Sequence, residues 1–163
     1  MYRDDPVWTW NAGKVLAPGP TVCVDIDGVL ADATHRQYLL DYHDWDSFFM
    51  AVGDDALLEP QAALLELLSE NHVVSLVTSR PQWVGDLTIG WLGRTGVRWD
   101  LLIMRSNGDY RRAPQVKANA VAQLRAGGFD PVLAFDDDER NVAAYEREGV
   151  PCVYIHSGYH PRD

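Results

Sequence analysis

The chain has 163 residues, of which 47% are hydrophobic and 23% are charged, and its formal net charge is −10. This length suits one domain with its own core, and the composition excludes disordered, collagen-like and coiled-coil proteins. The charge argues against binding along the length of a nucleic acid, because phosphate backbones attract basic surfaces.

Neither a membrane protein nor a secreted protein is expected. No apolar run reaches the roughly 18 residues that cross a membrane, and residues 1–20 lack the pattern of a secretory signal. Cys23 and Cys152 lie in apolar, strand-like runs, which indicates buried thiols in a reducing compartment rather than a disulfide framework. We therefore expect a cytoplasmic protein without a membrane segment.

Strands and helices alternate after an irregular lead-in at residues 1–20, which is rich in Trp, Pro and Gly. Apolar, β-branched runs predict strands at 21–24, 73–77, 101–104, 132–135 and 151–155. Helical composition predicts helices at 60–70, 82–95, 115–126 and 139–148. This order predicts an α/β fold in one domain at 21–163, with a five-stranded parallel sheet and helices on both of its faces.

Three polar segments follow apolar strands of this sheet. They are Asp25-Ile26-Asp27-Gly28, Thr78-Ser79-Arg80 and Asp136-Asp137-Asp138. Because ligands of such sheets bind beyond the carboxyl ends of the strands, we expect the three segments to meet there.

Acidic residues dominate two of the segments. Asp25 and Asp27 are separated by one apolar residue, a pattern that suits metal binding or nucleophilic and acid–base catalysis, although a polar turn would give the same residues. The run from Asp136 to Glu139 precedes a helix, whose N-terminus favours one or two acids. A divalent cation explains the whole run better, and oxygen ligands without His or Cys indicate Mg²⁺.

Cationic and hydroxyl groups accompany these acids. Thr78, Arg80 and Lys117 follow or lead towards the same strand ends, although each charge taken singly is typical of a solvated surface. Together they favour a phosphate ligand bridged to Mg²⁺ over a bare cation site.

These residues resemble, in order, the four motifs of the haloacid dehalogenase-like (HAD) phosphohydrolase superfamily, with Asp25 to Leu30, then Thr78, Lys117 and Asp136-Asp137. A narrower resemblance is to the phosphatase domain of phage-type polynucleotide kinase–phosphatase. It rests on segments spread over residues 21–160, namely 31–36, 44–49, 78–80, 104–105, 108–111 and 136–137. The kinase half of that family needs a P-loop, and no such motif occurs here, so kinase activity is not expected.

The resemblance implies a HAD-like Rossmannoid fold and a two-step phosphoryl transfer. Asp25 would be the nucleophile that forms an aspartyl-phosphate, and Asp27 the general acid and base. Thr78 and Lys117 would hold phosphoryl oxygens. Mg²⁺ would be held by Asp25, Asp27, Asp136 and Asp137, and the substrate would be bound by Arg36, Arg80, Ser79, Gly28 and Arg111.

The chain departs from the family before Lys117. The family usually has an acid a few positions earlier that helps to position the lysine, whereas residues 111–116 contain none. Asp137 or Asp138 is the expected replacement, and without one the activity would fall or the substrate would differ.

Residues 32–59 are expected to form a small lid rather than a full cap domain, which leaves the site open to a polymer end. Tyr38, Tyr42 and Trp45 lie in this segment with Phe48 and Phe49. A helical hairpin would bury such aromatics, and we expect this of the two phenylalanines, while a ring at the mouth could stack on a base.

Three functions follow from these interpretations. The first, which the narrower resemblance implies because that family's domain removes 3′-phosphates, is a Mg²⁺-dependent phosphatase that removes a 3′-phosphate from nucleic-acid ends or nucleotides. The others are a nucleotidase or small-molecule phosphomonoesterase on the same scaffold, and a module that binds nucleic-acid ends without hydrolysis. The expected partner is a phosphorylated nucleic-acid end or nucleotide, and a homo-oligomer is compatible with the sequence.

The net charge is distributed unevenly. Residues 80–125 carry a net charge of +5, and the remaining chain carries −15. If residues 105–112 lie beside the site, this basic stretch is where a polymer would approach; if they face away, a mononucleotide is favoured.

Overall fold

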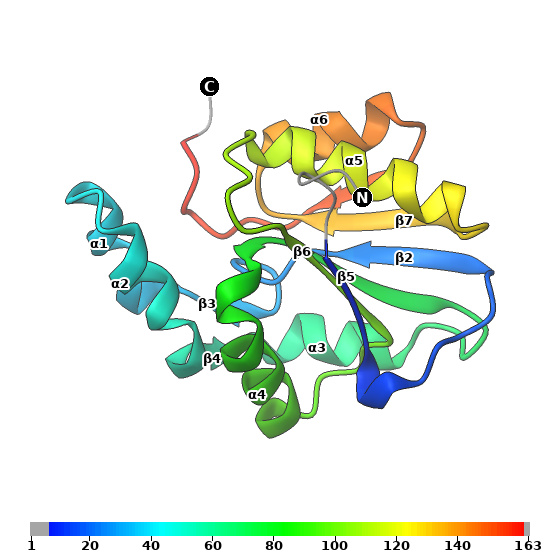
Figure 1. The fold of residues 1–163 in the computed structure, drawn as a ribbon, viewed down its shortest axis with the longest axis horizontal. Coiled ribbons are helices and arrows are strands. Elements are labelled where there is room, and N and C mark those ends of the chain that lie inside the picture. Colours follow the sequence, from blue (N-terminus) through cyan, green and yellow to red (C-terminus); the bar gives the residue numbers. More distant parts are fainter. Residues whose placement is uncertain (1–6, 162–163) are drawn as a thin grey trace.

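The computed structural model describes residues 7–161, which form a central sheet with helices on both faces (Figure 1). The sheet has six strands in the order β1-β6-β5-β2-β7-β8. Five of them run parallel to one another, as the sequence predicts: β2 (Pro20–Val24), β5 (Val73–Pro81), β6 (Leu101–Arg105), β7 (Asp130–Asp136) and β8 (Cys152–Tyr154).

The sixth strand corrects the prediction of an irregular lead-in. Strand β1 (Val7–Trp10) pairs antiparallel with β6 at the edge of the sheet. Its β-branched and aromatic residues suit an edge strand, and Trp8 and Trp10 pack against the core, each with its ring about 6 Å from that of Phe129 (6.0 and 5.9 Å). Packing of these partly buried rings on the core fixes four residues of a segment, 1–20, whose prolines and glycines suggested irregular chain.

Alternation along the strands divides the core into two layers. Val22, Val24 and Leu76 face the layer covered by α3 (Glu59–Glu66) and α4 (Gly85–Thr95). Cys23 and Val77, on the opposite side of the same strands, face the layer covered by α5 (Ala113–Ala126) and α6 (Glu139–Arg147). Successive side chains of a strand point to opposite faces, so continuous apolar runs bury both sides of the sheet.

The chain between β2 and α3 forms a small insert that packs on the core through Ala31 and Val52, and we call it the lid unit. Strands β3 (Ala31–Asp32) and β4 (Ala56–Leu57) pair antiparallel. Between them lie η2 (Thr34–Arg36), α1 (Tyr38–Asp41), α2 (Trp45–Met50) and η3 (Val52–Asp54). Figure 1 shows α1 and α2 projecting from one end of the sheet. This unit occupies the segment from which the sequence predicts a lid.

The two cysteines are free thiols, Cys23 buried and Cys152 partly buried. Within residues 7–161, no helix has the length and apolar character that crossing a membrane requires.

Candidate functional site

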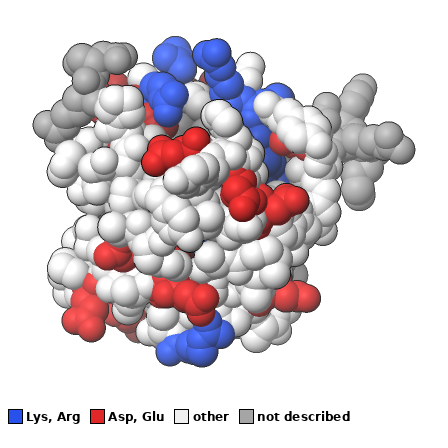
Figure 2. Space-filling view, turned by 90° about the vertical axis from the view of Figure 1, so that its left-hand side faces the viewer, with Lys and Arg blue, Asp and Glu red and all other residues white. Residues whose placement is uncertain are grey.

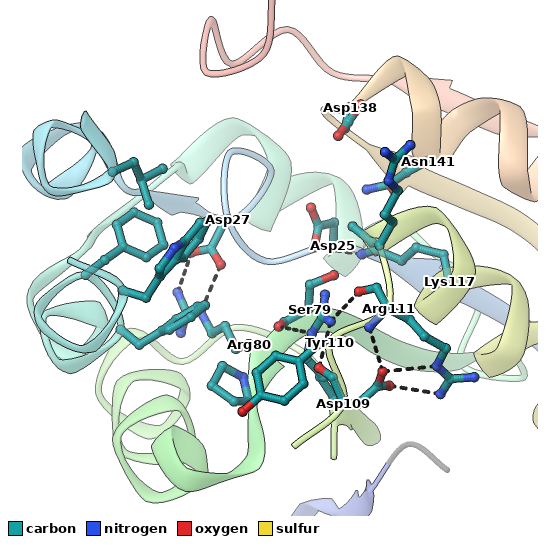
Figure 3. A pocket seen from close by; sticks show the side chains of 18 of the residues that line it. Asp25, Asp27, Ser79, Arg80, Asp109, Tyr110, Arg111, Lys117, Asp138 and Asn141 are labelled. Carbon is teal, nitrogen blue, oxygen red and sulfur yellow. Dashed lines mark hydrogen bonds and ion pairs between the residues drawn. The ribbon is translucent and has the colours of Figure 1, made fainter. Parts of the chain in front are cut away.

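The three polar segments meet at one end of the sheet and line a common pocket of about 760 Å³ (Figure 3). The lid unit and the loop between β6 and α5 complete its walls. Seven of the predicted site residues line it: Asp25, Asp27, Ser79, Arg80, Arg111, Lys117 and Asp137. The other four, Gly28, Arg36, Thr78 and Asp136, are each next to a lining residue in the chain.

Asp25 leaves the end of β2 and is 7% exposed. Its backbone N–H donates to the carbonyl of Phe135 (3.0 Å), and the carbonyl of Ile26 accepts from Val29, Leu30 and Ala31 in a tight turn. The turn fixes the carboxylate of Asp25 at the floor of the pocket.

Gly28 makes this turn possible. Its φ of +79° is disfavoured for other residues, and a Cβ there would overlap the carboxylate of Asp137 and lie 2.9 Å from Cβ of Ser157. The turn therefore approaches the end of β7 so closely that only glycine fits.

Lys117 reaches the same floor from α5. Its Nζ lies 2.9 Å from Oδ1 of Asp25 and 3.2 Å from Oδ2 of Asp136, and it donates to the carbonyl of Val77 at 2.5 Å. Burial alone would lower the pKa of Lys117, but the carboxylates of Asp136 and Asp25 outweigh it and hold the pKa above its ordinary value. The ammonium is therefore charged and faces the predicted nucleophile.

Three buried carboxylates gather here. One oxygen each of Asp25, Asp136 and Asp137 lies within 4.8 Å of the others. Burial raises the pKa of Asp25, and the charges of Asp136 and Asp137 raise it further against the opposing effect of Lys117. Such crowded, hard oxygen ligands suit a divalent cation, which would relieve the repulsion between them.

Asp138 has a different place from its two neighbours. It caps α6 by accepting from the backbone N–H of Arg140 at 2.9 Å, and it pairs with the guanidinium of the same residue. Lys117 has Asp25 and Asp136 as its carboxylate partners. Asp136 therefore takes the position for which the sequence suggested Asp137 or Asp138.

Arg36 and Arg80 form a buried network around Asp27. Arg80 binds both oxygens of Asp27, at 3.1 and 2.8 Å, and Arg36 donates to Oδ1 of the same carboxylate. Burial would raise the pKa of Asp27, but Arg80 and Arg36 outweigh it and hold the pKa well below its usual range. Both arginine side chains are fully buried, so in this state they bind Asp27 rather than an open anion site.

Asp55 belongs to this network, and the sequence did not indicate it. Its Oδ2 accepts from Arg36 (2.7 Å) and Arg80 (3.0 Å), and its Oδ1 lies 2.8 Å from Nε2 of His35. The buried guanidiniums of Arg36 and Arg80 need a second negative charge besides that of Asp27, and Asp55 supplies it. This charge balance was the only signal by which the sequence could have indicated Asp55.

Thr78 and Ser79 end the straight part of β5. The Thr78 hydroxyl is buried and accepts from the N–H of Arg80 at 3.1 Å. The buried Oγ of Ser79, a pocket-lining residue, has no hydrogen-bond partner among the described residues. A buried hydroxyl without a partner suits a ligand oxygen.

Residues 105–112, which we call the basic loop, lie beside the site. Arg105 donates to the carbonyls of Ser79 (3.0 Å) and Arg111 (2.5 Å), which holds the loop against β5. Arg111 pairs with Asp109 at 2.8 Å, and Arg112 also lines the pocket. Figure 2 shows most Lys and Arg of one face along its upper part, with acidic side chains across its middle and lower parts and a further basic group at the lower edge.

Comparison with known proteins places this geometry in a family. The structure is similar to one chain in a structure of a Pnkp1/Rnl/Hen1 complex, with 25% sequence identity and a TM-score of 0.71. The match covers 85% of this chain and 45% of the chain in the complex. A HAD family enzyme of Bacteroides thetaiotaomicron, in complex with magnesium and inorganic phosphate, shares the fold at 12% identity and a TM-score of 0.52, with 85% and 95% of the two chains covered.

One curated relative is an isoleucine–tRNA ligase of Zymomonas mobilis subsp. mobilis, 27% identical over 165 residues. That match covers 79% of this chain and 17% of the ligase, so the chain spans less than a fifth of this relative.

The family model of the polynucleotide kinase PNKP phosphatase domain matches residues 19–160, which include both acidic strand ends, the lid unit and the basic loop. The chain therefore belongs to the PNKP phosphatase-domain family of HAD-like phosphatases.

Proposed function

We propose that the protein is a Mg²⁺-dependent phosphatase that removes the 3′-phosphate from a nucleic-acid end or nucleotide through an aspartyl-phosphate on Asp25. The observation that carries the proposal is the contact of Lys117 with Asp25 and Asp136 at the floor of a pocket walled by the basic loop. Membership in the PNKP phosphatase-domain family supports the 3′-phosphate as the group removed.

Asp25 attacks phosphorus with its carboxylate oxygen, and the bond from phosphorus to the 3′-oxygen breaks. Lys117 binds the phosphoryl oxygens and offsets the charge that develops on them. Thr78 and Ser79, at the end of β5, supply hydroxyl groups to the same oxygens. These donors are preorganised, because β5 and α5 hold them before substrate arrives.

Asp27 acts as the general acid and then as the general base. Its low pKa keeps it ionised in the free protein, which suits the base that removes a proton from the hydrolytic water. In the first step the protonated carboxyl of Asp27 gives its proton to the leaving 3′-oxygen. In the second step the water that Asp27 deprotonates attacks phosphorus, the bond from phosphorus to Asp25 breaks, and inorganic phosphate leaves. A phosphate beside Asp27 would raise its pKa by like-charge repulsion, and a shift of Arg36 or Arg80 towards that phosphate would raise it further.

The carboxylates of Asp25, Asp136 and Asp137, together with the backbone carbonyl of Asp27, would hold Mg²⁺. Bound Mg²⁺ would supply charge neutralisation between the carboxylates and the incoming phosphate. The buried, crowded oxygens of the three aspartates are the donor set that this ion prefers.

A phosphate-release panel tests the proposal. It compares single-stranded DNA and RNA carrying a 3′-phosphate, the same strands carrying a 5′-phosphate, 3′-mononucleotides and 5′-mononucleotides, each with Mg²⁺ and with EDTA. We expect Mg²⁺-dependent release from the 3′-phosphates. Equal or faster release from 5′-mononucleotides would instead identify a nucleotidase, and binding without release would identify a non-catalytic module.

A further inference from the structure

Three exposed aromatic side chains line the same pocket as Asp25. Trp45 of α2 is 53% exposed, Trp83 of η4 (Gln82–Val84) is 45% exposed, and Tyr110 of the basic loop is 95% exposed. Exposed tryptophans gathered in one concave surface are typical of a binding site, because soluble proteins seldom leave such area open to water.

The aromatic side chains form a connected wall. Phe49 stacks on Trp45 at a centroid distance of 6.1 Å with 27° between the planes, and it meets Trp83 edge-on at 6.2 Å. The backbone N–H of Trp83 donates to Oδ1 of Asn107 at 3.0 Å, which ties the wall to the loop that carries Tyr110. Both tryptophans are therefore held in place before a ligand binds.

The other residues of the pocket complement a nucleic-acid strand. Arg105, Arg111 and Arg112 of the basic loop line the pocket, and Figure 3 shows Arg111 and Tyr110 among the lining residues together with Ser79. Aromatic faces stack on bases of any sequence, and guanidiniums bind phosphodiesters. At about 760 Å³, the pocket is larger than a phosphoryl group alone requires.

We propose that Trp45, Trp83 and Tyr110 form a base-stacking subsite for the terminal nucleotides of a single strand, with the basic loop binding the next phosphodiester. The proposal rests on the proposed function and deepens it: the substrate is a single-stranded 3′ end rather than a free mononucleotide. A base in a duplex would have to unpair before it could stack on these aromatic side chains, so duplex ends are poorer substrates than single-stranded ends.

Abasic strands test the subsite. The substrates are a single-stranded 3′-phosphorylated oligonucleotide and the same oligonucleotide with abasic sugars at its two 3′-terminal positions. We expect wild type to show a KM about 5- to 150-fold lower for the strand with bases. Trp45→Ala and Trp83→Ala should lose this preference, Trp45→Phe should keep most of it, and circular dichroism checks that each variant is folded.

Tyr42→Ala is the matched control. Tyr42 is 77% exposed in the same lid unit and does not belong to the lining of the pocket. It should leave both the turnover and the preference for bases unchanged.

The outcomes separate the subsite from the proposed function. If wild type releases 3′-phosphate but the tryptophan variants keep the preference for bases, the subsite is wrong and the proposed function stands. If wild type hydrolyses acetyl phosphate but neither oligonucleotide, the proposed function is wrong, and the proposed subsite is wrong as well. A wild-type enzyme that treats mononucleotides and oligonucleotides alike would also overturn the subsite.

Discussion

Nζ of Lys117 lies 2.9 Å from Oδ1 of Asp25, although 92 positions separate the two residues in the chain. The contact joins the first helical turns of α5 to the end of β2, and it places the only buried ammonium of the described residues beside the proposed nucleophile. Parallel strands bring such distant residues together because their carboxyl ends share one edge of the sheet.

Replacing Lys117 by Met should lower kcat by about 10²- to 10³-fold, because the charge that meets the phosphoryl oxygens is lost. Phosphate release at saturating Mg²⁺ measures the effect. The second lysine of the chain, Lys14, is exposed, so Lys14→Met is the control and should retain full activity. Equal activity of the two variants would contradict the role of Lys117.

The network around Asp55 predicts a loss of stability. Asp55→Asn leaves the buried guanidiniums of Arg36 and Arg80 with only Asp27, and should lower the free energy of unfolding by about 3 kcal/mol. Urea denaturation measures this change. Its neighbour Asp54 is exposed, and Asp54→Asn should change the unfolding free energy by less than about 0.5 kcal/mol.

A side chain at position 28 should clash with its neighbours, and this effect can be measured separately from backbone strain. Gly28→Ala and Gly13→Ala both place alanine at positive φ, +79° and +70°, but only the Cβ at position 28 meets other atoms. Backbone strain of about 1 kcal/mol is common to both variants. We expect Gly28→Ala to lose clearly more stability and to need more Mg²⁺ for half-maximal activity, because Asp137 is displaced. Similar losses in both variants would show that the close approach is unimportant.

Asp109 predicts a pH dependence of stability. Its hydrogen bonds from Arg111 outweigh burial and lower its pKa below the ordinary value. A lowered pKa stabilises the folded protein above the unfolded pKa of about 3.9, and this contribution is lost as the pH falls through the folded pKa. Asp109→Asn should therefore lower the unfolding free energy by about 1 kcal/mol at pH 7.

The difference between wild type and Asp109→Asn should stay constant from pH 7 to about 5 and shrink below about pH 4. Urea denaturation across this range measures it. Asp41→Asn, a change at an exposed aspartate of the lid unit, is the control for the removal of one surface charge. A difference that grows as the pH falls would contradict the assigned sign.

The parallel strands and the strand-end acids were predictable, because apolar runs and the acids that follow them are local signals. Strand β1 was not, because only packing of Trp8 and Trp10 on Phe129 reveals its place. The predicted helix at 60–70 ends at Glu66, and the one at 82–95 begins as the 3-10 turn η4.

Site residues that directly follow a strand could be predicted from the sequence. Residues whose place depends on balancing the charge of distant side chains could not. Asp55 carries no motif, and its partners Arg36 and Arg80 lie 19 and 25 positions away. Tyr110 and Trp83 likewise lie on separate segments, and only the folded chain shows that they share one pocket.

In the proposed function, Asp25 removes a 3′-phosphate in this pocket with the help of Mg²⁺. The most direct measurement is a single-turnover assay, with enzyme in excess over a single-stranded 3′-phosphorylated oligonucleotide. Wild type should convert the end to a 3′-hydroxyl with Mg²⁺ and not with EDTA, and Asp25→Asn should bind the strand without converting it. Conversion by Asp25→Asn at the wild-type rate, or none by wild type, would contradict the claim.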